Sequence, residues 1–359
     1  MRENMRDELA SQILQKINSW PRFKFLHLPT PVKFLANLTE KYRGPEIYIK
    51  RDDLTGWGFG GNKSRKLEFI MADALKKGHN SLLTWGSVQS NWCFQCALTS
   101  RRFGLKPILI LFYQDKKPED EGNILLDRLA EAEIYFHQAP PGKVVTRDLA
   151  SSLIEKMLPE LKEKNLNPYV VSVGGSMPFG SMEAPLGAIS YLLAFHEAWE
   201  QAKNLGISFN YIVHATGSGA TQTGLLLGAK IFSPQTKVIG ISVSEEKTSF
   251  SQEVRTIVEA SLKALSLELK IEAEDIIVLD DYLEGGYGVF SHRVTRIIKE
   301  LLQGEGVVLD PVYTAKAMIG LIDLIERRYF QTKDKVLFFH TGGTPALFAY
   351  GKKILALEK

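Results

Sequence analysis

The sequence contains few cysteines, no long apolar run and almost no excess of charge of either sign. Its two cysteines, Cys93 and Cys96, are too few for a disulfide framework or a four-cysteine zinc site. No segment reaches the roughly 18 consecutive apolar residues that a membrane-spanning helix needs. Residues 1–20 lack the apolar core of a signal peptide. We therefore expect a cytoplasmic protein with no metal site and no membrane partner.

Lysine and arginine total 44 against 41 aspartates and glutamates, which gives a formal net charge of +3. This balance argues against nucleic acid as a partner, because nucleic-acid-binding domains carry a strongly basic surface. Hydrophobic residues make up 45% of the chain and charged residues 24%, proportions that are typical of globular proteins. The chain is long enough for about two domains, and a small molecule is the expected ligand.

Strands and helices alternate along both halves of the chain. Strands are expected at residues 46–51, 81–85, 106–113, 133–137, 169–173, 211–215, 237–243, 276–279, 307–309 and 335–339, with helices between most of them. This alternation indicates parallel sheets that are covered on both faces. We predict an α/β protein of two domains, each a mostly parallel twisted sheet flanked by helices, with a ligand in the cleft between them. The large domain is expected to comprise residues 1–66 and 171–359, and the small domain residues 67–170.

A glycine pair precedes Lys63 at the start of a predicted helix. After Gly60 and Gly61, apolar residues recur at helical spacing until Gly78. A helix dipole disfavours the protonated form of an amine at the helix N-terminus, and a less protonated amine can act as a nucleophile or base. Lys63 is therefore a candidate for covalent catalysis. The alternatives are a solvated surface lysine and a phosphate-binding P-loop, although Asn62 interrupts the Gly-Lys pair that a P-loop requires.

Two loops that follow predicted strands have the composition of anion sites. Residues 86–91 open a helix, and Ser90 and Asn91 there suit a carboxylate, although either could simply cap the helix. Residues 216–224 are rich in glycine and small hydroxyl residues and suit a phosphate. The dinucleotide fingerprint would require glycine at Gln222, so a monophosphate is the better fit. A reactive lysine together with a monophosphate loop indicates pyridoxal 5′-phosphate (PLP).

Three further residues lie in loops that are expected to face the same cleft. Tyr313 and Thr341 each follow a strand predicted in the C-terminal half, and Tyr287 lies between glycines that would expose its ring. A tyrosine in a turn more often packs than catalyses, so residue type alone does not assign these positions a function.

These motifs together resemble the family of D-cysteine desulfhydrases and 1-aminocyclopropane-1-carboxylate deaminases. The resemblance extends from about Leu28 to about Tyr350. It is carried by Gly60-Gly61-Asn62-Lys63, Gln89-Ser90-Asn91, Gly174-Gly175-Ser176, Asp310-Pro311-Val312-Tyr313 and His340-Thr341-Gly342-Gly343. Such proteins are fold-type II PLP enzymes, the class of the tryptophan synthase β subunit. The resemblance alone also implies a homodimer.

The resemblance implies how matched positions would hold the cofactor. Lys63 would form a Schiff base with PLP and later move the Cα proton. Asn91 would contact the phenolic oxygen of the cofactor, and Thr341 would face the pyridine nitrogen. A neutral hydroxyl at that nitrogen suits β-elimination. The phosphate would lie on the loop formed by Gly217, Ser218, Gly219, Ala220 and Thr221.

The resemblance also implies where an amino-acid substrate would bind. The substrate carboxylate would lie against Gln89, Ser90 and Asn91, and Tyr287 and Tyr313 would line the substrate side. Together with Lys63, the catalytic candidates are therefore Ser90, Tyr287 and Tyr313.

Residue 314 distinguishes the two activities within the family. The resemblance implies that the deaminases carry glutamate directly after the tyrosine of the Asp-Pro-Val-Tyr motif, whereas this chain carries Thr314, as the desulfhydrases do. The absence of an acid favours α,β-elimination of D-cysteine to pyruvate, ammonia and hydrogen sulfide. Deamination of 1-aminocyclopropane-1-carboxylate, elimination from another β-substituted amino acid, and cofactor binding without turnover stay open as alternatives.

The chain departs from the family pattern directly after Asn91. Relatives usually carry histidine and arginine where this chain has Trp92 and Phe94, so a bulky ring is expected beside the carboxylate site. The change also completes the motif Cys93-Phe94-Gln95-Cys96, whose spacing matches thioredoxin-type dithiols. A dithiol redox protein is therefore an alternative from a different class, although such cysteines are more often small core residues.

Overall fold

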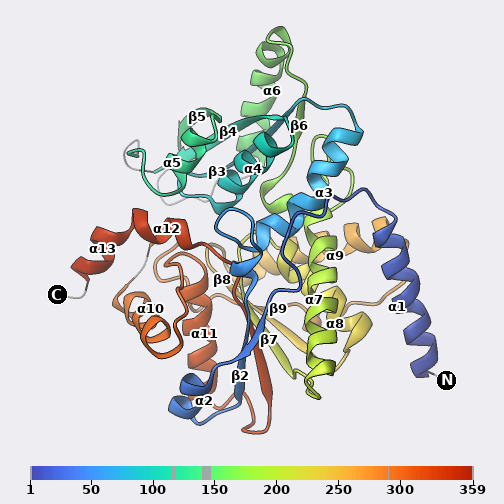
Figure 1. Cartoon of the computed structure of the whole chain (residues 1–359), viewed down its shortest axis with the longest axis vertical. Coiled ribbons are helices and arrows are strands. Elements are labelled where there is room, and N and C mark those ends of the chain that lie inside the picture. Colours follow the sequence, from blue (N-terminus) through green and yellow to red (C-terminus); the bar gives the residue numbers. More distant parts are fainter. Residues whose placement is uncertain (1, 115–117, 140–146, 290, 358–359) are drawn as a thin grey trace.

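The computed structural model describes residues 2–114, 118–139, 147–289 and 291–357, which form two sheets with helices packed on them (Figure 1). The larger sheet has the strand order β1, β2, β10, β7, β8, β9, and every pair is parallel except the edge pair β1 and β2. Its strands are β1 (Val32–Phe34), β2 (Glu46–Lys50), β7 (Tyr211–Thr216), β8 (Lys237–Ser242), β9 (Ile277–Leu279) and β10 (Lys335–Phe339). The smaller sheet is parallel throughout, in the order β5, β4, β3, β6. It consists of β3 (Ser81–Ser87), β4 (Lys106–Tyr113), β5 (Glu133–Gln138) and β6 (Pro168–Val170).

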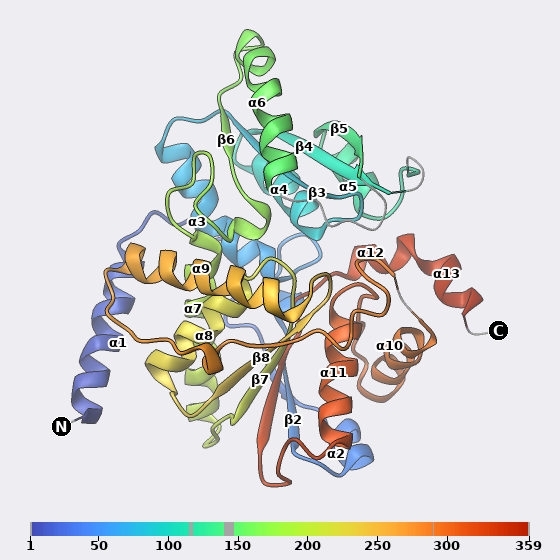
Figure 2. The ribbon, with the colours of Figure 1, turned by 180° about the vertical axis from the view of Figure 1, so that it is seen from behind.

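Helices cover the larger sheet on both faces because its strand residues alternate between two cores. Leu337 and Phe339 of β10 pack into one hydrophobic cluster with α7 and α8, whereas Val336 and Phe338 pack into another with α10 and α11. Figure 2 shows α9 and α1 beyond the helices α7 and α8, and both of them contact α8. The α-helices are α1 (Arg2–Asn18), α2 (Ala36–Tyr42), α3 (Asn62–Lys76), α4 (Asn91–Arg102), α5 (Asn123–Leu129), α6 (Arg147–Glu163), α7 (Leu186–Asn204), α8 (Ala220–Phe232), α9 (Lys247–Leu265), α10 (His292–Glu305), α11 (Thr314–Glu326), α12 (Thr344–Ala349) and α13 (Gly351–Ala356).

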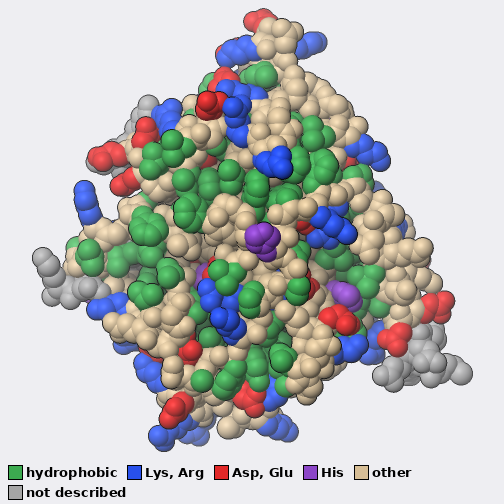
Figure 3. Space-filling view, viewed as in Figure 1, with side chains coloured by type: hydrophobic (Ala, Val, Ile, Leu, Met, Phe, Trp, Pro, Cys, Tyr) green, Lys and Arg blue, Asp and Glu red, His purple; other side chains and the backbone are tan. Residues whose placement is uncertain are grey.

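The smaller sheet packs between α6 on one face and α3 with α4 on the other. Leu83 and Ile110 lie in a cluster with α6, whereas Leu82 and Leu109 lie in the main cluster with α3 and α4. Because the main cluster also contains α7 and α8, one continuous core joins the two sheets. On the face shown in Figure 3, acidic and basic side chains are interspersed. None of the helices within the described ranges is long and apolar enough to span a membrane.

The predicted fold class is confirmed, with differences in particular elements. Residues 307–309 do not form a strand. They are irregular chain, and Val307 and Leu309 are buried in the cluster with α10 and α11. The short edge strand β1 was not predicted. Residues 144–146 of the helix expected near 144–158 lie outside the described residues, and α6 begins at Arg147. The division into domains at residues 66 and 170 stays a prediction, and α3 crosses its first boundary.

Candidate active site

Lys63 is the second residue of α3, and glycine is needed on both positions before the helix. Gly60 and Gly61 have φ values of +68° and +113°, which only glycine adopts readily. The backbone there packs closely against the loop after β10, because Asn62 N donates to the Thr341 carbonyl at 3.0 Å. A Cβ atom on Gly61 would lie 3.0 Å from that carbonyl oxygen. The start of α3 is therefore fixed against the end of the central strand β10.

The amine of Lys63 is partly buried and weakly held. Its Nζ donates to Asn62 Oδ1 at 2.9 Å. Burial lowers the pKa of Lys63 from 10.5 to about 8, although Asp310 and Cys96 act in the opposite direction. The direction agrees with the sequence analysis, but the main cause is burial rather than the helix dipole. An amine with a pKa of about 8 is neutral in roughly one molecule in ten at pH 7, hundreds of times more often than an ordinary lysine, and the neutral form can act as a nucleophile or base.

The glycine-rich loop after β7 meets the start of α3. Gly219, with a φ of +73°, precedes the first residue of α8, and Thr221 lies in the first turn of that helix. Thr221 Oγ1 accepts a hydrogen bond from Asn62 Nδ2 at 3.0 Å. A Cβ atom on Gly217 would lie 3.7 Å from the ring of Tyr313. The predicted phosphate loop, Lys63 and Tyr313 are therefore neighbours, and the free N–H groups at the start of α8 suit an anion.

Lys66 also belongs to this site, although the sequence analysis did not select it. Its side chain is 1% exposed, and its ammonium has no hydrogen-bond acceptor among the described residues. A Cβ atom on Gly174 would lie 3.5 Å from Lys66 Nζ and 2.3 Å from Ser218 Oγ, so the ammonium lies close to the glycine-rich loop. Burial, together with Lys63, lowers the pKa of Lys66 well below its usual value. Its position three residues after Lys63, on the same side of a helix, was the available signal.

The two candidate tyrosines form a pair. The hydroxyls of Tyr287 and Tyr313 are 2.5 Å apart, and Ser87 Oγ donates to Tyr287 Oη at 3.0 Å. Lys63 Nζ lies 5.9 Å from the centre of the Tyr313 ring. Burial raises the pKa of both phenols, so both stay protonated at neutral pH. Ser87, which sequence reasoning missed, connects the smaller sheet to this pair.

The loop predicted for the substrate carboxylate is partly engaged within the protein. Ser90 caps α4, and its Oγ accepts from Cys93 N at 3.2 Å. The Gln89 side chain accepts from Asn123 N at 2.8 Å and donates to the Glu121 carbonyl at 3.0 Å. Asn91 Oδ1 accepts from Asn123 Nδ2 at 2.9 Å. Gln89 therefore shapes the loop through its contacts with Glu121 and Asn123.

A pocket beside Lys63 collects several of these residues. It is partly open to solvent, and the unfilled space there, adjoining solvent included, is about 240 Å³. It is lined by Phe59, Gly60, Gly61, Asn62, Lys63, Asn91, Phe94, Gln95, Thr341, Gly343 and Pro345. Of the two bulky rings expected beside the predicted carboxylate site, Phe94 lines this pocket together with Asn91. Trp92 is 1% exposed in the main core and donates from Nε1 to Thr84 Oγ1 at 2.8 Å.

Comparison with known proteins places this arrangement in a family. Residues 24–342 match the family model described as pyridoxal-phosphate dependent enzyme. The chain belongs to this family. A protein of Pyrococcus abyssi named "putative 1-aminocyclopropane-1-carboxylate deaminase" is 36% identical over 341 residues, with 95% of this chain and 97% of the relative covered. A D-cysteine desulfhydrase of Serratia proteamaculans is 37% identical over 344 residues, with 95% and 99% covered.

Solved structures agree with this membership. The crystal structure of a homologue of 1-aminocyclopropane-1-carboxylate (ACC) deaminase matches with a TM-score of 0.85 at 34% identity, and the match covers 96% of this chain and 99% of that one. A threonine deaminase isoform of Solanum lycopersicum matches with a TM-score of 0.62 at 15% identity, covering 98% and 88%, which supports the fold alone. The predicted family, the PLP-dependent enzyme class and the fold are therefore confirmed.

The residues of this PLP-dependent enzyme fit the cofactor that the family uses. Lys66 is buried, and no acceptor for its amine is found in the described part of the chain. It lies beside the glycine-rich loop at the start of α8, so the two offer a cation and free N–H groups to a phosphate. Lys63 lies next to that loop through Asn62 and Thr221, where its amine can meet an aldehyde. Asn91 and Thr341 line the same pocket.

The two cysteines do not have the properties of a redox pair. Cys93 and Cys96 are free and fully buried on α4, within the main core. Burial raises the pKa of both thiols. Redox-active cysteines need accessible sulfur and a lowered pKa, so the motif is better explained by packing against α3 and the smaller sheet.

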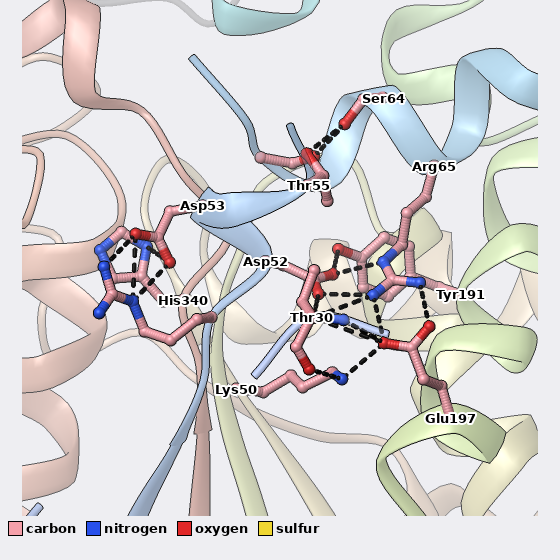
Figure 4. Close-up of polar contacts among 12 residues, drawn as sticks. Thr30, Lys50, Asp52, Asp53, Thr55, Ser64, Arg65, Tyr191, Glu197 and His340 are labelled. Atoms are coloured by element: carbon pink, nitrogen blue, oxygen red, sulfur yellow. Dashed lines mark hydrogen bonds and ion pairs between the residues drawn. The ribbon is translucent and has the colours of Figure 1, made fainter. Parts of the chain in front are cut away.

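An ionic network of Thr30, Lys50, Asp52, Arg65, Tyr191 and Glu197 lies on the other side of α3 (Figure 4). Arg65 binds both carboxylate oxygens of Asp52 at 2.8 Å and those of Glu197 at 2.9 and 3.0 Å. Lys50 Nζ donates to Glu197 at 2.6 Å, and Tyr191 Oη donates to Asp52 at 2.6 Å. The positive charges of Lys50 and Arg65 are therefore compensated by the two carboxylates of the network, at the place where β2, α3 and α7 meet.

Proposed function

We propose that this PLP-dependent enzyme is a lyase that acts on D-cysteine and water to give pyruvate, ammonia and hydrogen sulfide. The observation that carries the proposal is which proton-donating groups lie near Lys63. The protonated Tyr287 and Tyr313 pair lies near the amine, and none of the described residues that line the pocket carries a carboxylate. A phenol can donate a proton to a leaving sulfur, whereas opening a cyclopropane ring would be helped by an acid at the reacting carbons.

Each residue near Lys63 has a defined task in this proposal. When bound, PLP stabilises the negative charge that develops at the substrate Cα. Lys63 binds the cofactor and, as a free amine with a pKa of about 8, removes the Cα proton. Tyr313, hydrogen-bonded to Tyr287, keeps its proton until the substrate sulfur departs. Lys66 and the N–H groups of residues 217–221 hold the phosphate.

The start of α4 orients the substrate and excludes water in this proposal. Its free N–H groups attract the substrate carboxylate, Asn91 contacts the bound molecule, and Phe94 with Phe59 closes the wall of the pocket. Ser90 keeps the helix start in place through its cap to Cys93.

The neighbourhood of Thr314 supports elimination over ring opening. Thr314 is fully buried, and its hydroxyl donates to Asp310 Oδ1 at 2.7 Å. Asp310 also accepts from the backbone N–H groups of Val312 and Tyr313, so its carboxylate is occupied in holding the loop. A glutamate in place of Thr314 would put a second carboxylate beside Asp310. The relatives named for 1-aminocyclopropane-1-carboxylate nevertheless favour deamination of that substrate as the second candidate.

The experiment begins with the purified protein, its visible spectrum and reduction with borohydride. Mass spectrometry should locate the reduced cofactor on Lys63. D-cysteine, L-cysteine, β-chloro-D-alanine and 1-aminocyclopropane-1-carboxylate are then compared for keto acid and sulfide. We expect D-cysteine to give pyruvate and sulfide with the highest kcat/KM. Ring opening as the faster reaction would establish the second candidate, and the absence of a labelled lysine would contradict both.

The remaining biological features are proposals from the family resemblance. We propose a homodimer in the cytoplasm, with a small amino acid as the substrate and with neither nucleic acid nor a membrane as a partner. Sedimentation at several protein concentrations tests the assembly, since a dimer has twice the 40.3 kDa mass of the chain.

A further inference from the structure

Lys316 is a fully buried lysine whose ammonium contacts the loop that carries Tyr287. It lies on α11 with 0% exposure. Its Nζ donates to the carbonyl oxygens of Leu283 and Gly286, both at 2.7 Å. Burial opposes the charge of this ammonium and lowers the pKa of Lys316 to about 8, while the two backbone carbonyls accept hydrogen bonds from it. Glu284 and Asp310 add electrostatic attraction.

The loop at residues 283–289 depends on the Lys316 ammonium, because its backbone has an unusual conformation that directs two carbonyls at one point. Glu284, Gly285, Gly286 and Gly288 have φ values of +54°, +94°, +121° and +72°. Two backbone hydrogen bonds close the turn, from Gly286 N to the Leu283 carbonyl at 2.9 Å and from Val289 N to the Gly286 carbonyl at 3.2 Å. Both accepting carbonyls are the ones that bind Lys316. Without a cation, two carbonyl dipoles directed at one point would repel each other.

Tyr287 directly follows one of these carbonyls. It lies between Gly286 and Gly288, whose conformational freedom would let the tyrosine move. Its hydroxyl must nevertheless reach Tyr313 at 2.5 Å and Ser87 at 3.0 Å. Tyr313 itself immediately precedes α11, the helix that carries Lys316. The same helix start therefore places Tyr313 directly and Tyr287 through Lys316.

We propose that Lys316 is a positioning residue, a built-in cation that binds the carbonyls of Leu283 and Gly286 and so aligns Tyr287 with Tyr313. This inference rests on the proposed function, in which the tyrosine pair holds the proton for the leaving group. Lys316 itself does not touch the pocket beside Lys63. Its effect on the reaction is transmitted by the backbone of residues 283–287.

We call the contact of Lys316 with the Leu283 and Gly286 carbonyls the Lys316 clamp. Hydrogen exchange of the substrate-free protein tests this clamp. Lys316→Met removes the ammonium and keeps the side-chain length. Tyr282→Phe is the matched control, because it deletes a different hydrogen bond between the same segment and α11, from Tyr282 Oη to Asp323 at 2.6 Å. We expect the amides of Gly286 and Val289 to exchange at least about tenfold faster in Lys316→Met than in Tyr282→Phe. Equal exchange in the two variants overturns the proposal.

Kinetics then test whether the clamp acts through Tyr287. We expect Lys316→Met to lower kcat by about 10- to 100-fold, because a misplacement of about 1 Å costs rates of that order. KM should change by less than about threefold, because the residue touches no substrate. In a Tyr287→Phe background the same substitution should lower kcat by less than about twofold, since two residues that act as a unit are not additive. An undiminished effect in that background means that Lys316 acts by another route and overturns the proposal.

A second variant keeps the test valid if Lys316→Met does not fold. Lys316→Arg retains a cation and donors, so it should show a smaller rise in exchange and a smaller loss of kcat. In either variant the two effects must occur together, and one without the other contradicts the clamp. The proposed function fails differently, through the absence of a labelled Lys63 or of D-cysteine turnover. Kinetics then use whichever amino acid yields keto acid, and hydrogen exchange decides on its own if none does.

Discussion

The first turns of α3 present two faces that differ in how their charges are compensated. Arg65 enters the ionic network and binds Asp52 and Glu197 through four hydrogen bonds. On the other face, Lys63 has only the amide oxygen of Asn62, and Lys66 has no acceptor among the described residues. Burial opposes the charge on all three side chains. The carboxylates nevertheless raise the pKa of Arg65 well above its usual value, whereas the pKa values of both lysines fall.

This difference separates a structural face from a binding face within one helix. A buried charge with full compensation holds elements together, and its loss leaves partners unpaired. A buried cation without compensation lowers the stability of the ligand-free protein and is favourable only when an anion binds. Substitutions on the two faces should therefore change different measured quantities, as the following predictions specify.

The largest effect is expected from Lys63→Ala. Loss of the base should lower the elimination rate by at least about 10³-fold and abolish borohydride labelling of the chain. The melting temperature should stay close to that of the unsubstituted apo protein, because the amine's contacts within the described ranges are one hydrogen bond to Asn62 and a distant one with the Tyr313 ring. A variant that retains a tenth of the activity would exclude Lys63 as the base.

Arg65→Met should have the largest effect on stability. Removing one partner from a buried ion pair costs about 3–5 kcal/mol, because the remaining charges stay buried. The free energy of unfolding of the apo protein, from denaturant titration, measures this loss. Arg101→Met is the control on an exposed pair with Glu131, for which less than about 1 kcal/mol is expected. Equal losses in the two variants would contradict the structural role of the network.

Lys66→Met should separate cofactor affinity from stability. Loss of a charge-assisted hydrogen bond worth about 1.5–3 kcal/mol should weaken PLP binding by about 10- to 100-fold. The apo protein should be as stable as the parent or more stable, because an uncompensated cation has been removed. Lys50→Met is the control, since Lys50 is also buried but is paired with Glu197; that variant should lose stability. Destabilisation in both cases would show that Lys66 is compensated within the protein.

The pH dependence of cofactor uptake should show the lowered pKa of Lys63. Only the neutral amine attacks the aldehyde, so uptake by the apo protein should rise about tenfold per pH unit below pH 8 and level off above it. An unperturbed lysine would keep gaining rate until about pH 10.5. Stopped-flow absorbance measures the rate, with Lys63→Ala as the blank. A midpoint near 10.5 would contradict the buried environment of the amine.

The smallest effect is expected from replacing both cysteines with alanine. Cys93 and Cys96 fill space in the core, so the double variant should lose some stability, about 1–2 kcal/mol for each truncated side chain. Its kcat should stay within about twofold of the parent and should not respond to dithiothreitol. Activity that depends on the oxidation state of the parent protein would restore the dithiol alternative.

Sequence periodicity located most of the fold because strands buried on both faces appear as continuous apolar runs. The strands at residues 106–113 and 335–339 were predicted with the bounds that the structure shows. The run at residues 307–309 has the same composition but lies in irregular chain beneath helices, and periodicity does not separate those two kinds of burial. The short strand β1 has too few residues for a pattern.

The candidate site was predictable where a local motif carries the chemistry. Lys63 and the loop at residues 217–221 were found from glycines and helix starts, and the structure brings them together through Asn62 and Thr221. Lys66, Ser87 and Lys316 were missed because their significance depends on which residues face them across elements that are distant in sequence. The direction of Trp92 was likewise set by tertiary packing, which turns its ring into the core.

The central place of β10 in the larger sheet has a consequence for the order in which a newly made chain can fold. The strands β2 and β7 do not pair with each other, because β10 lies between them. All strands of the smaller sheet lie within residues 81–170, so that sheet can assemble while the residues after 170 are still being synthesised. Until residues 335–339 emerge, β2 and β7 each have one unpaired edge, and such open edges can pair wrongly with other chains.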